Sequence, residues 1–244
     1  MDKQSIREAV WEDLEASGVA RFPFPPTDRI PNFAGADEAA ERLAERPAWE
    51  GAGTVKSNPD APQLPVRRQA LRDEITVFVA QPRLRDADPF LRLEPGEIAD
   101  IGDATTVSGI STHGAAVGPD NVPVVDLIVA GSVAVGSDGQ RIGKGEGYSD
   151  LEWGMLAELG AVTEETTVAT TVHERQVLDG QPGISADMPE PEPHDVPLDL
   201  IVTPERTIQT NTQYDQPAGV DWNRLPTDRL DEIPVLAELA PEDR

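Results

Sequence analysis

The chain has 244 residues, a length that suits one domain or one domain with short appendages. It contains no cysteine, which excludes disulfides and cysteine-ligated zinc or iron–sulfur sites. Acidic residues number 45 against 20 Lys and Arg, so the formal net charge is −25 and a broad basic face for nucleic acid is not expected.

The first third of the chain predicts helices interrupted by proline-rich connections. Residues 2–17 place Ile6, Val10 and Leu14 about one helical turn apart, and Gly18 is a natural end for that helix. The following stretch is extended or turning, because Pro23, Pro25, Pro26 and Pro31 block helix interiors. Further helices are expected over 36–46 and 65–74.

The rest of the chain alternates between apolar strands and helices. Strands are expected at 53–56, 75–80, 124–135, 166–173 and 198–203, with a helix at 150–160 and mostly loop over 97–123. The run at 124–135 is almost wholly apolar, as in a strand that is covered on both faces. This order predicts an α/β fold, a doubly wound and mostly parallel sheet with helices on both faces, formed by a single domain over 1–214.

Residues 215–244 are acidic and broken by prolines, so they are expected to form a C-terminal tail. Trp222, Leu225 and Leu236 are apolar and could dock part of the tail on the domain. The end itself is expected to be mobile.

The charge also predicts where the protein works. Lysine occurs only at Lys3, Lys56 and Lys144, and such an acidic chain repels itself unless salt screens the charges. We therefore expect a cytoplasm rich in salt, as in a halophilic archaeon; a disordered acidic protein is the alternative. The N-terminus lacks the apolar run of a signal peptide. The sequence also has no apolar stretch of about 18 residues, so no membrane span is expected.

The segment RIGKGEGYSD (141–150) carries three glycines at alternate positions, between an expected strand and an expected helix. Ligands bind at such junctions in doubly wound sheets, and a helix N-terminus favours phosphate. The spacing fits neither the P-loop nor the dinucleotide pattern, so a tight turn without a ligand is the alternative. Asp150 could likewise be only a helix-capping or first-turn acid.

Several segments resemble the 5-formyltetrahydrofolate cyclo-ligase (methenyltetrahydrofolate synthetase) family. The glycine segment and DLIVAGSVAV (126–135) resemble two family motifs, and KQSIR (3–7), TVKSNPD (54–60) and HDVPLDLIVT (194–203) agree in order. The chain is most similar to the methenyltetrahydrofolate synthetase domain-containing branch, through RIPNF (29–33) and VKSNPDAPQLPVR (55–67). The resemblance implies a fold like that of NagB, RpiA and CoA transferases, in a cytoplasmic enzyme.

The resemblance also implies a reaction, with ATP and Mg²⁺ as cofactors. The formyl oxygen of 5-formyltetrahydrofolate is phosphorylated, the other folate nitrogen attacks, and phosphate leaves to give 5,10-methenyltetrahydrofolate. The implied ATP-binding residues are Lys3, Arg7, Arg141, Gly143, Lys144, Gly145, Gly147 and Tyr148, of which Lys144 and Tyr148 are also the implied catalytic residues. Val55 and Asp60 are implied to bind folate, and Asp150 and Asp195 to hold Mg²⁺.

Departures from the family keep a second function open. Ser149 replaces a tyrosine, Glu146 would repel phosphate unless it faces a cation, and Asp60 is one methylene shorter than the family's glutamate. A paralogue without cyclo-ligase activity is the alternative: a nucleotide-binding protein with a regulatory or thiamine-linked role. An RNA-binding module is disfavoured by the charge. Of the histidines, His194 is expected at the surface, His113 near the site and His173 at a strand end.

Overall fold

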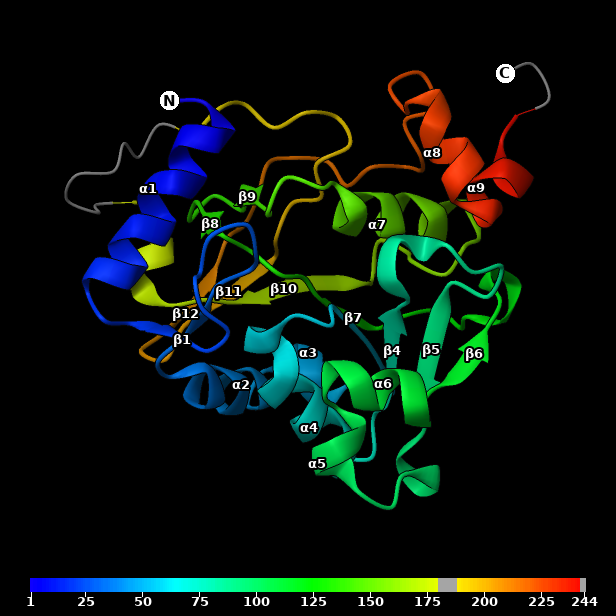
Figure 1. Cartoon of the computed structure of the whole chain (residues 1–244), viewed down its shortest axis with the longest axis horizontal. Coiled ribbons are helices and arrows are strands. Elements are labelled where there is room, and N and C mark those ends of the chain that lie inside the picture. Colours follow the sequence, from blue (N-terminus) through cyan, green and yellow to red (C-terminus); the bar gives the residue numbers. More distant parts are fainter. Residues whose placement is uncertain (180–187, 242–244) are drawn as a thin grey trace.

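The computed structural model describes residues 1–179 and 188–241, which form a single domain around an eight-stranded sheet (Figure 1). The strand order is β12-β11-β10-β7-β3-β4-β5-β6. Five central strands are parallel: β3 (Thr54–Ser57), β4 (Thr76–Ala80), β7 (Leu127–Val129), β10 (Thr167–Thr171) and β11 (Leu200–Val202). The antiparallel edge strands are β5 (Phe90–Leu93), β6 (Ala115–Val117) and β12 (Thr207–Gln209). The predicted mostly parallel sheet is confirmed.

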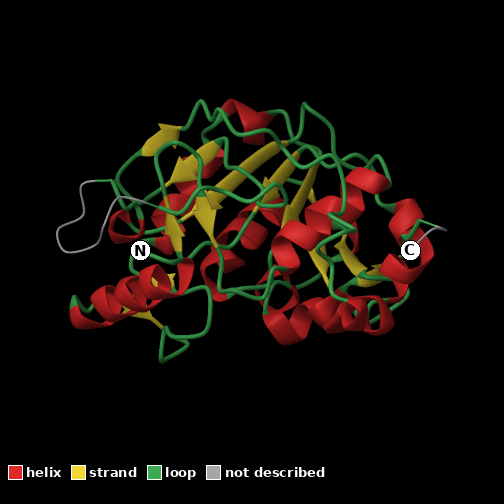
Figure 2. Cartoon of the chain, turned by 90° about the horizontal axis from the view of Figure 1, so that it is seen from above, coloured by secondary structure: helices red, strands yellow, loops and turns green. Residues whose placement is uncertain are grey.

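Helices cover both faces of the sheet, as predicted (Figures 1 and 2). One face packs on α2 (Ala36–Ala44), α3 (Pro47–Glu50), α4 (Leu64–Arg72), α5 (Ile101–Ala104) and α6 (Val107–His113). The other packs on α7 (Tyr148–Glu158), α8 (Thr227–Glu232) and α9 (Pro234–Leu239). The N-terminal helix α1 (Lys3–Ala16) instead buries Ile6, Val10 and Leu14 against a small ribbon of β8 (Ala134–Val135) and β9 (Arg141–Ile142).

The order of the parallel strands creates a switch point between β3 and β7. The chain winds from β3 to β4 in one direction, and through β7, β10 and β11 in the other. Two loops therefore separate at the carboxyl ends of β3 and β7, and leave a crevice where doubly wound proteins bind ligands. Asn58 follows the first strand and Ala130 follows the second.

The prediction of one strand over 124–135 was wrong. The sheet contains only Leu127–Val129, and the chain leaves it at Ala130 before forming β8 in the separate ribbon. Both pieces are buried, because α1 covers the ribbon while helices cover the sheet. The two short buried strands therefore form one continuous apolar run in the sequence, because an apolar run has no periodicity that would mark the break between them.

One region has more secondary structure than expected, and the C-terminal segment packs on the domain as expected. Residues 97–123 contain α5, α6 and β6, and β5 before them was not predicted. In the C-terminal segment, Leu236 is fully buried and Trp222 and Leu225 pack on the same core, as expected. The expected mobile end falls partly on 242–244, outside the described residues. None of the helices in the described part of the chain has the length and apolarity that crossing a bilayer requires.

Two further strands complete the description of the N-terminal region. β1 (Ala20–Arg21) and β2 (Asn32–Phe33) pair antiparallel beside α1. They enclose the proline-rich stretch that the sequence predicted to be extended or turning. This hairpin-like region brings Ile30 to the switch-point crevice.

Candidate functional site

A pocket of about 550 Å³ opens at the switch point. The loops after β3, β4 and β7 line it, together with the N-terminus of α1 and the segment from β9 to α7. All but one of the predicted site residues line this pocket: Lys3, Arg7, Asp60, Arg141, Gly143, Lys144, Gly145, Gly147, Tyr148, Asp150 and Asp195. The fold thus brings residues from the whole length of the chain to one crevice.

Val55 is the exception. It is fully buried on β3 among Val77, Leu127 and Val129, and it is not among the residues that line the pocket. Side chains alternate between the two faces of a strand, and Val55 points to the face that α2 and α4 cover. We therefore leave Val55 out of the candidate site.

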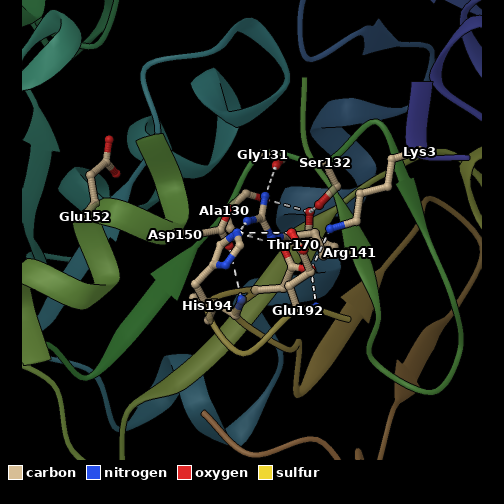
Figure 3. Close-up of polar contacts among 12 residues, drawn as sticks. Lys3, Ala130, Gly131, Ser132, Arg141, Asp150, Glu152, Thr170, Glu192 and His194 are labelled. Atoms are coloured by element: carbon tan, nitrogen blue, oxygen red, sulfur yellow. Dashed lines mark hydrogen bonds and ion pairs between the residues drawn. The ribbon is translucent and has the colours of Figure 1, made fainter. Parts of the chain in front are cut away.

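The predicted phosphate-binding cations are held in place by oxygen partners, and Figure 3 shows two of them, Lys3 and Arg141. Lys3 Nζ lies 2.5 Å from Asp195 Oδ2, and Arg7 Nε donates to the Gly143 carbonyl at 2.7 Å. The largest effect on the Arg7 guanidinium is burial, which lowers its pKa. These pairings orient cations around the glycine segment in advance of any ligand.

Arg141 is the most buried of these cations. Its guanidinium pairs with Asp150 and donates to the Gly131 carbonyl at 3.1 Å, so it joins β9 to α7 and to the loop after β7. Asp150 lies in the first turn of α7 and also accepts the Val196 N–H at 3.1 Å. It is therefore a first-turn acid, and at the same time it lines the pocket.

The glycine segment approaches the N-terminal helix closely. Gly145 has φ +104°, and a Cβ built on it would lie 3.3 Å from Arg7 Cζ. Gly147 has φ +71° and is the N-cap of α7. Left-handed backbone strongly favours glycine, so these two positions explain the alternate spacing. Glu146, expected to repel phosphate unless paired, lies 2.7 Å from Lys144 Nζ.

Each of the two predicted metal ligands has one carboxylate oxygen that accepts no hydrogen bond in the described part of the chain, although His194 Nε2 lies 3.9 Å from Asp195 Oδ1. Asp150 Oδ1 and Asp195 Oδ2 accept hydrogen bonds, and within residues 1–179 and 188–241 no hydrogen bond reaches Asp150 Oδ2 or Asp195 Oδ1. No group of three or more potential ligands for a metal ion occurs in this described part. Mg²⁺ commonly binds through one or two carboxylates, waters and substrate phosphates, so the donors fit a Mg²⁺ that arrives with a nucleotide.

The loop after β3, which brings the Asn58 amide and the Asp60 carboxyl to the pocket, is held by a buried arginine. Arg67 of α4 is fully buried and donates to the carbonyls of Asn58, Pro59 and Asp60 at 2.5, 3.2 and 3.2 Å. Burial lowers the pKa of Arg67 to about 10. This arginine fixes the loop after β3 so that Asp60 faces the pocket. The sequence showed it only as one of three arginines in a helix, and we did not predict its role.

The Asp60 carboxyl has a raised pKa, chiefly because it is buried, while Lys144 and Arg67 oppose the rise. The folded protein therefore binds the Asp60 proton more tightly than the unfolded chain does. The contribution of Asp60 to the free energy of unfolding is fully present below the ordinary pKa of 3.8 and is lost as pH rises through the higher folded-state pKa. We expect Asp60→Asn to melt at a higher temperature than the wild type at pH 7. This gain should vanish as pH falls below about 4. Melting curves of both proteins across this range test the expectation; exposed Asp37→Asn is the control, and a gain independent of pH would contradict it.

The C-terminal segment contacts the glycine segment from the other side. Arg229 of α8 stacks over the Tyr148 ring, with its Cζ 4.5 Å from the ring centroid, and donates to the Glu146 carbonyl at 3.1 Å. Arg224 pairs with Glu192 at 2.5 Å, and Glu192 itself lines the pocket. The sequence indicated docking of this segment but not its contact with the candidate site.

The histidines take three different places. His194 lines the pocket, with Nε2 at 3.6 Å from Glu192 and 3.9 Å from Asp195. His113 pairs with Asp103 and is not a lining residue, contrary to the expectation that it lies near the site. His173 follows β10, where its Nδ1 accepts the Arg175 N–H at 3.2 Å, so the expected strand-end position is confirmed.

Comparison with known proteins shows the family of the chain. The profile of the 5-formyltetrahydrofolate cyclo-ligase family matches residues 1–204. The methenyltetrahydrofolate synthase domain-containing proteins of Bos taurus and Homo sapiens are 42% and 38% identical over 98% of the chain. The chain spans 62% and 61% of their lengths. These relatives are from animals and do not support the halophilic source expected from the charge.

A solved structure shows the same fold. The NMR structure of Aquifex aeolicus 5,10-methenyltetrahydrofolate synthetase matches 92% of this chain and 100% of its own, with a TM-score of 0.52 and 16% identity. At that identity the likeness concerns the fold. The matched family region ends at residue 204, before the C-terminal segment that contacts Tyr148 and Glu146.

Proposed function

Because the chain belongs to the 5-formyltetrahydrofolate cyclo-ligase family, we propose that it closes 5-formyltetrahydrofolate to 5,10-methenyltetrahydrofolate with ATP. The observation that carries the proposal is the mixed lining of the switch-point pocket. Lys3, Arg7, Arg141 and Lys144 line it around the glycine segment, and the Asn58–Asp60 loop lines it as well. Cations suit the triphosphate, and acceptor oxygens suit the N–H groups of a pterin ring.

In the proposed reaction the formyl oxygen attacks the γ-phosphorus of ATP, and ADP leaves. The second folate nitrogen then attacks the formyl carbon and gives up its proton, and the C–O bond breaks to release phosphate, which carries that proton as hydrogen phosphate. Phosphoryl transfer depends mainly on positioning and charge neutralisation. Lys144 would neutralise charge on the transferred group, Tyr148 would pack against a bound ring, and the backbone of the glycine segment would face the phosphates.

Asp150 and Asp195 would hold Mg²⁺ through their unused oxygens. Mg²⁺ neutralises phosphate charge when it is bound. Arg141 and Lys3 orient the two carboxylates, because each cation pairs with the other oxygen of its partner. The small-molecule partners are thus a folate or related heterocycle and MgATP, and we place the reaction in the cytoplasm.

The test is an assay of the purified protein in about 2 M KCl, where the Debye length is only a few Å. MgATP and 5-formyltetrahydrofolate are added, and methenyltetrahydrofolate is followed by its near-ultraviolet absorbance. We expect product from the wild type and a loss of about 100-fold in Asp150→Asn, a magnitude typical of altered metal surroundings. Asp37→Asn is the matched control, because Asp37 is an exposed acid in the first turn of α2.

The alternative is a paralogue that binds a nucleotide without this activity. The changes at Glu146, Ser149 and Asp60 favour it, since all three line the pocket. If the wild type forms no product but melts at a higher temperature with MgATP, the result supports this paralogue and contradicts the cyclo-ligase proposal. The loop after β3 argues for the enzyme, because Arg67 holds it beside an open pocket.

A further inference from the structure

A buried lysine interrupts an apolar row at the centre of the sheet. Lys56 on β3 lies in register between Phe78 of β4 and Ile128 of β7, on the face that α7 covers. It is 1% exposed. The proposed reaction does not use Lys56, and an apolar side chain would match its neighbours Phe78 and Ile128 in polarity.

Glu152 of α7 meets this lysine. Its Oε2 pairs with Lys56 Nζ, and the two side chains are 6% and 2% exposed. A buried ion pair is a weak stabilising device, because desolvation of both charges offsets their attraction and apolar replacements are often as stable. The pair therefore calls for a function other than holding α7 on the sheet.

Glu152 also faces the pocket. It is a lining residue, and among the described residues only Lys56 hydrogen-bonds to its carboxylate, through Oε2. The second oxygen is left for a ligand. The contact with Lys56 fixes the position of the carboxylate beside the pocket.

Further unused acceptors lie on the neighbouring loop. The Asn58 side chain lines the pocket, and its Oδ1 is buried without a hydrogen-bond partner among the described residues. Glu152 and Lys56 are close enough to affect the protonation of Asp60. Buried polar atoms normally have partners, so an unpaired acceptor in a pocket points to a donor on the ligand.

We propose that Glu152 and Asn58 determine substrate specificity by accepting hydrogen bonds from the amino and ring N–H groups of a planar heterocycle. Lys56 is the positioning residue that holds the Glu152 carboxylate in place. The identity of the heterocycle as a reduced pterin rests on the proposed function. Recognition of an amino-substituted ring does not, because it follows from the acceptors alone.

The test uses two ring probes, pterin and lumazine, which carries an oxygen in place of the 2-amino group of pterin. We expect the wild type to bind pterin at least tenfold more tightly than lumazine in equilibrium titrations. Glu152→Gln should lose this preference while its affinity for MgATP changes less than twofold. Glu158→Gln is the matched control, since Glu158 lies on the same helix and does not line the pocket.

The double variant Lys56→Met with Glu152→Leu keeps the test independent of folding. We expect it to melt no lower than the wild type and still to lose the preference for pterin. A folded Glu152→Gln or double variant that keeps the preference would overturn the inference, and so would a wild type that binds neither probe or binds both equally. A wild type that prefers pterin but forms no methenyltetrahydrofolate would defeat the proposed cyclo-ligase activity and leave this inference supported.

Discussion

Replacing Arg141 by methionine should lower the free energy of unfolding by about 3 kcal/mol, because it leaves a largely buried carboxylate without its cation. The Arg141 side chain is 4% exposed and that of Asp150 is 14% exposed, so water cannot fully replace the lost partner. The same change should abolish measurable ATP binding if the proposed function holds, since Arg141 lines the pocket beside the glycine segment. Chemical denaturation and calorimetric titration with MgATP measure the two effects.

A second substitution separates stability from binding. Arg141→Met combined with Asp150→Asn removes the uncompensated charge, while the amide oxygen can still accept the Val196 N–H. We expect the double variant to recover most of the lost stability but none of the ATP affinity. If Arg141→Met is as stable as the wild type, the ion pair does not have the role described here.

Replacing Gly145 by alanine should weaken ATP binding about tenfold, equivalent to about 1.4 kcal/mol. Gly145 has φ +104°, and its added Cβ would lie 3.3 Å from Arg7 Cζ. The variant must therefore move either the glycine segment or the guanidinium that binds the Gly143 carbonyl. Titration with MgATP measures the change in affinity.

Gly18→Ala is the control for backbone strain. Gly18 also has a positive φ, +71°, but no atom lies within 4 Å of the position that an added Cβ would take. The variant should therefore lose some stability and keep its ATP affinity. Equal losses of affinity in the two variants would show that strain alone, and not the contact with Arg7, causes the effect.

Much of the sheet could be predicted from the sequence because parallel strands are covered on both faces and read as apolar runs. The same property hid the break at Ala130, where one buried strand ends and another soon begins in a different layer. Helices α5 and α6 were missed because they have only four and seven residues, too few for a clear periodicity.

The site residues that belong to a sequence motif could be predicted, whereas those brought to the pocket by packing could not. The glycine segment identified Arg141 and Asp150, and both line the pocket. The resemblance implied Val55, but the direction in which a strand residue faces depends on packing, and on β3 Val55 faces the core between the sheet and helices α2 and α4. The partner of Lys56 lies 96 residues away on α7, and no local pattern joins them.

The contacts at the glycine segment also bear on how the protein folds. Lys3 meets Asp195 across 192 residues, and Arg229 meets Glu146 across 83. Closing such long loops has an entropic cost that must be met before the contacts form, and proteins rich in distant contacts fold slowly. We therefore expect the pocket to be completed late in folding, after the sheet has formed. If a nucleotide binds there, as proposed, it stabilises the fully folded chain relative to partly folded ones and raises the free energy of unfolding.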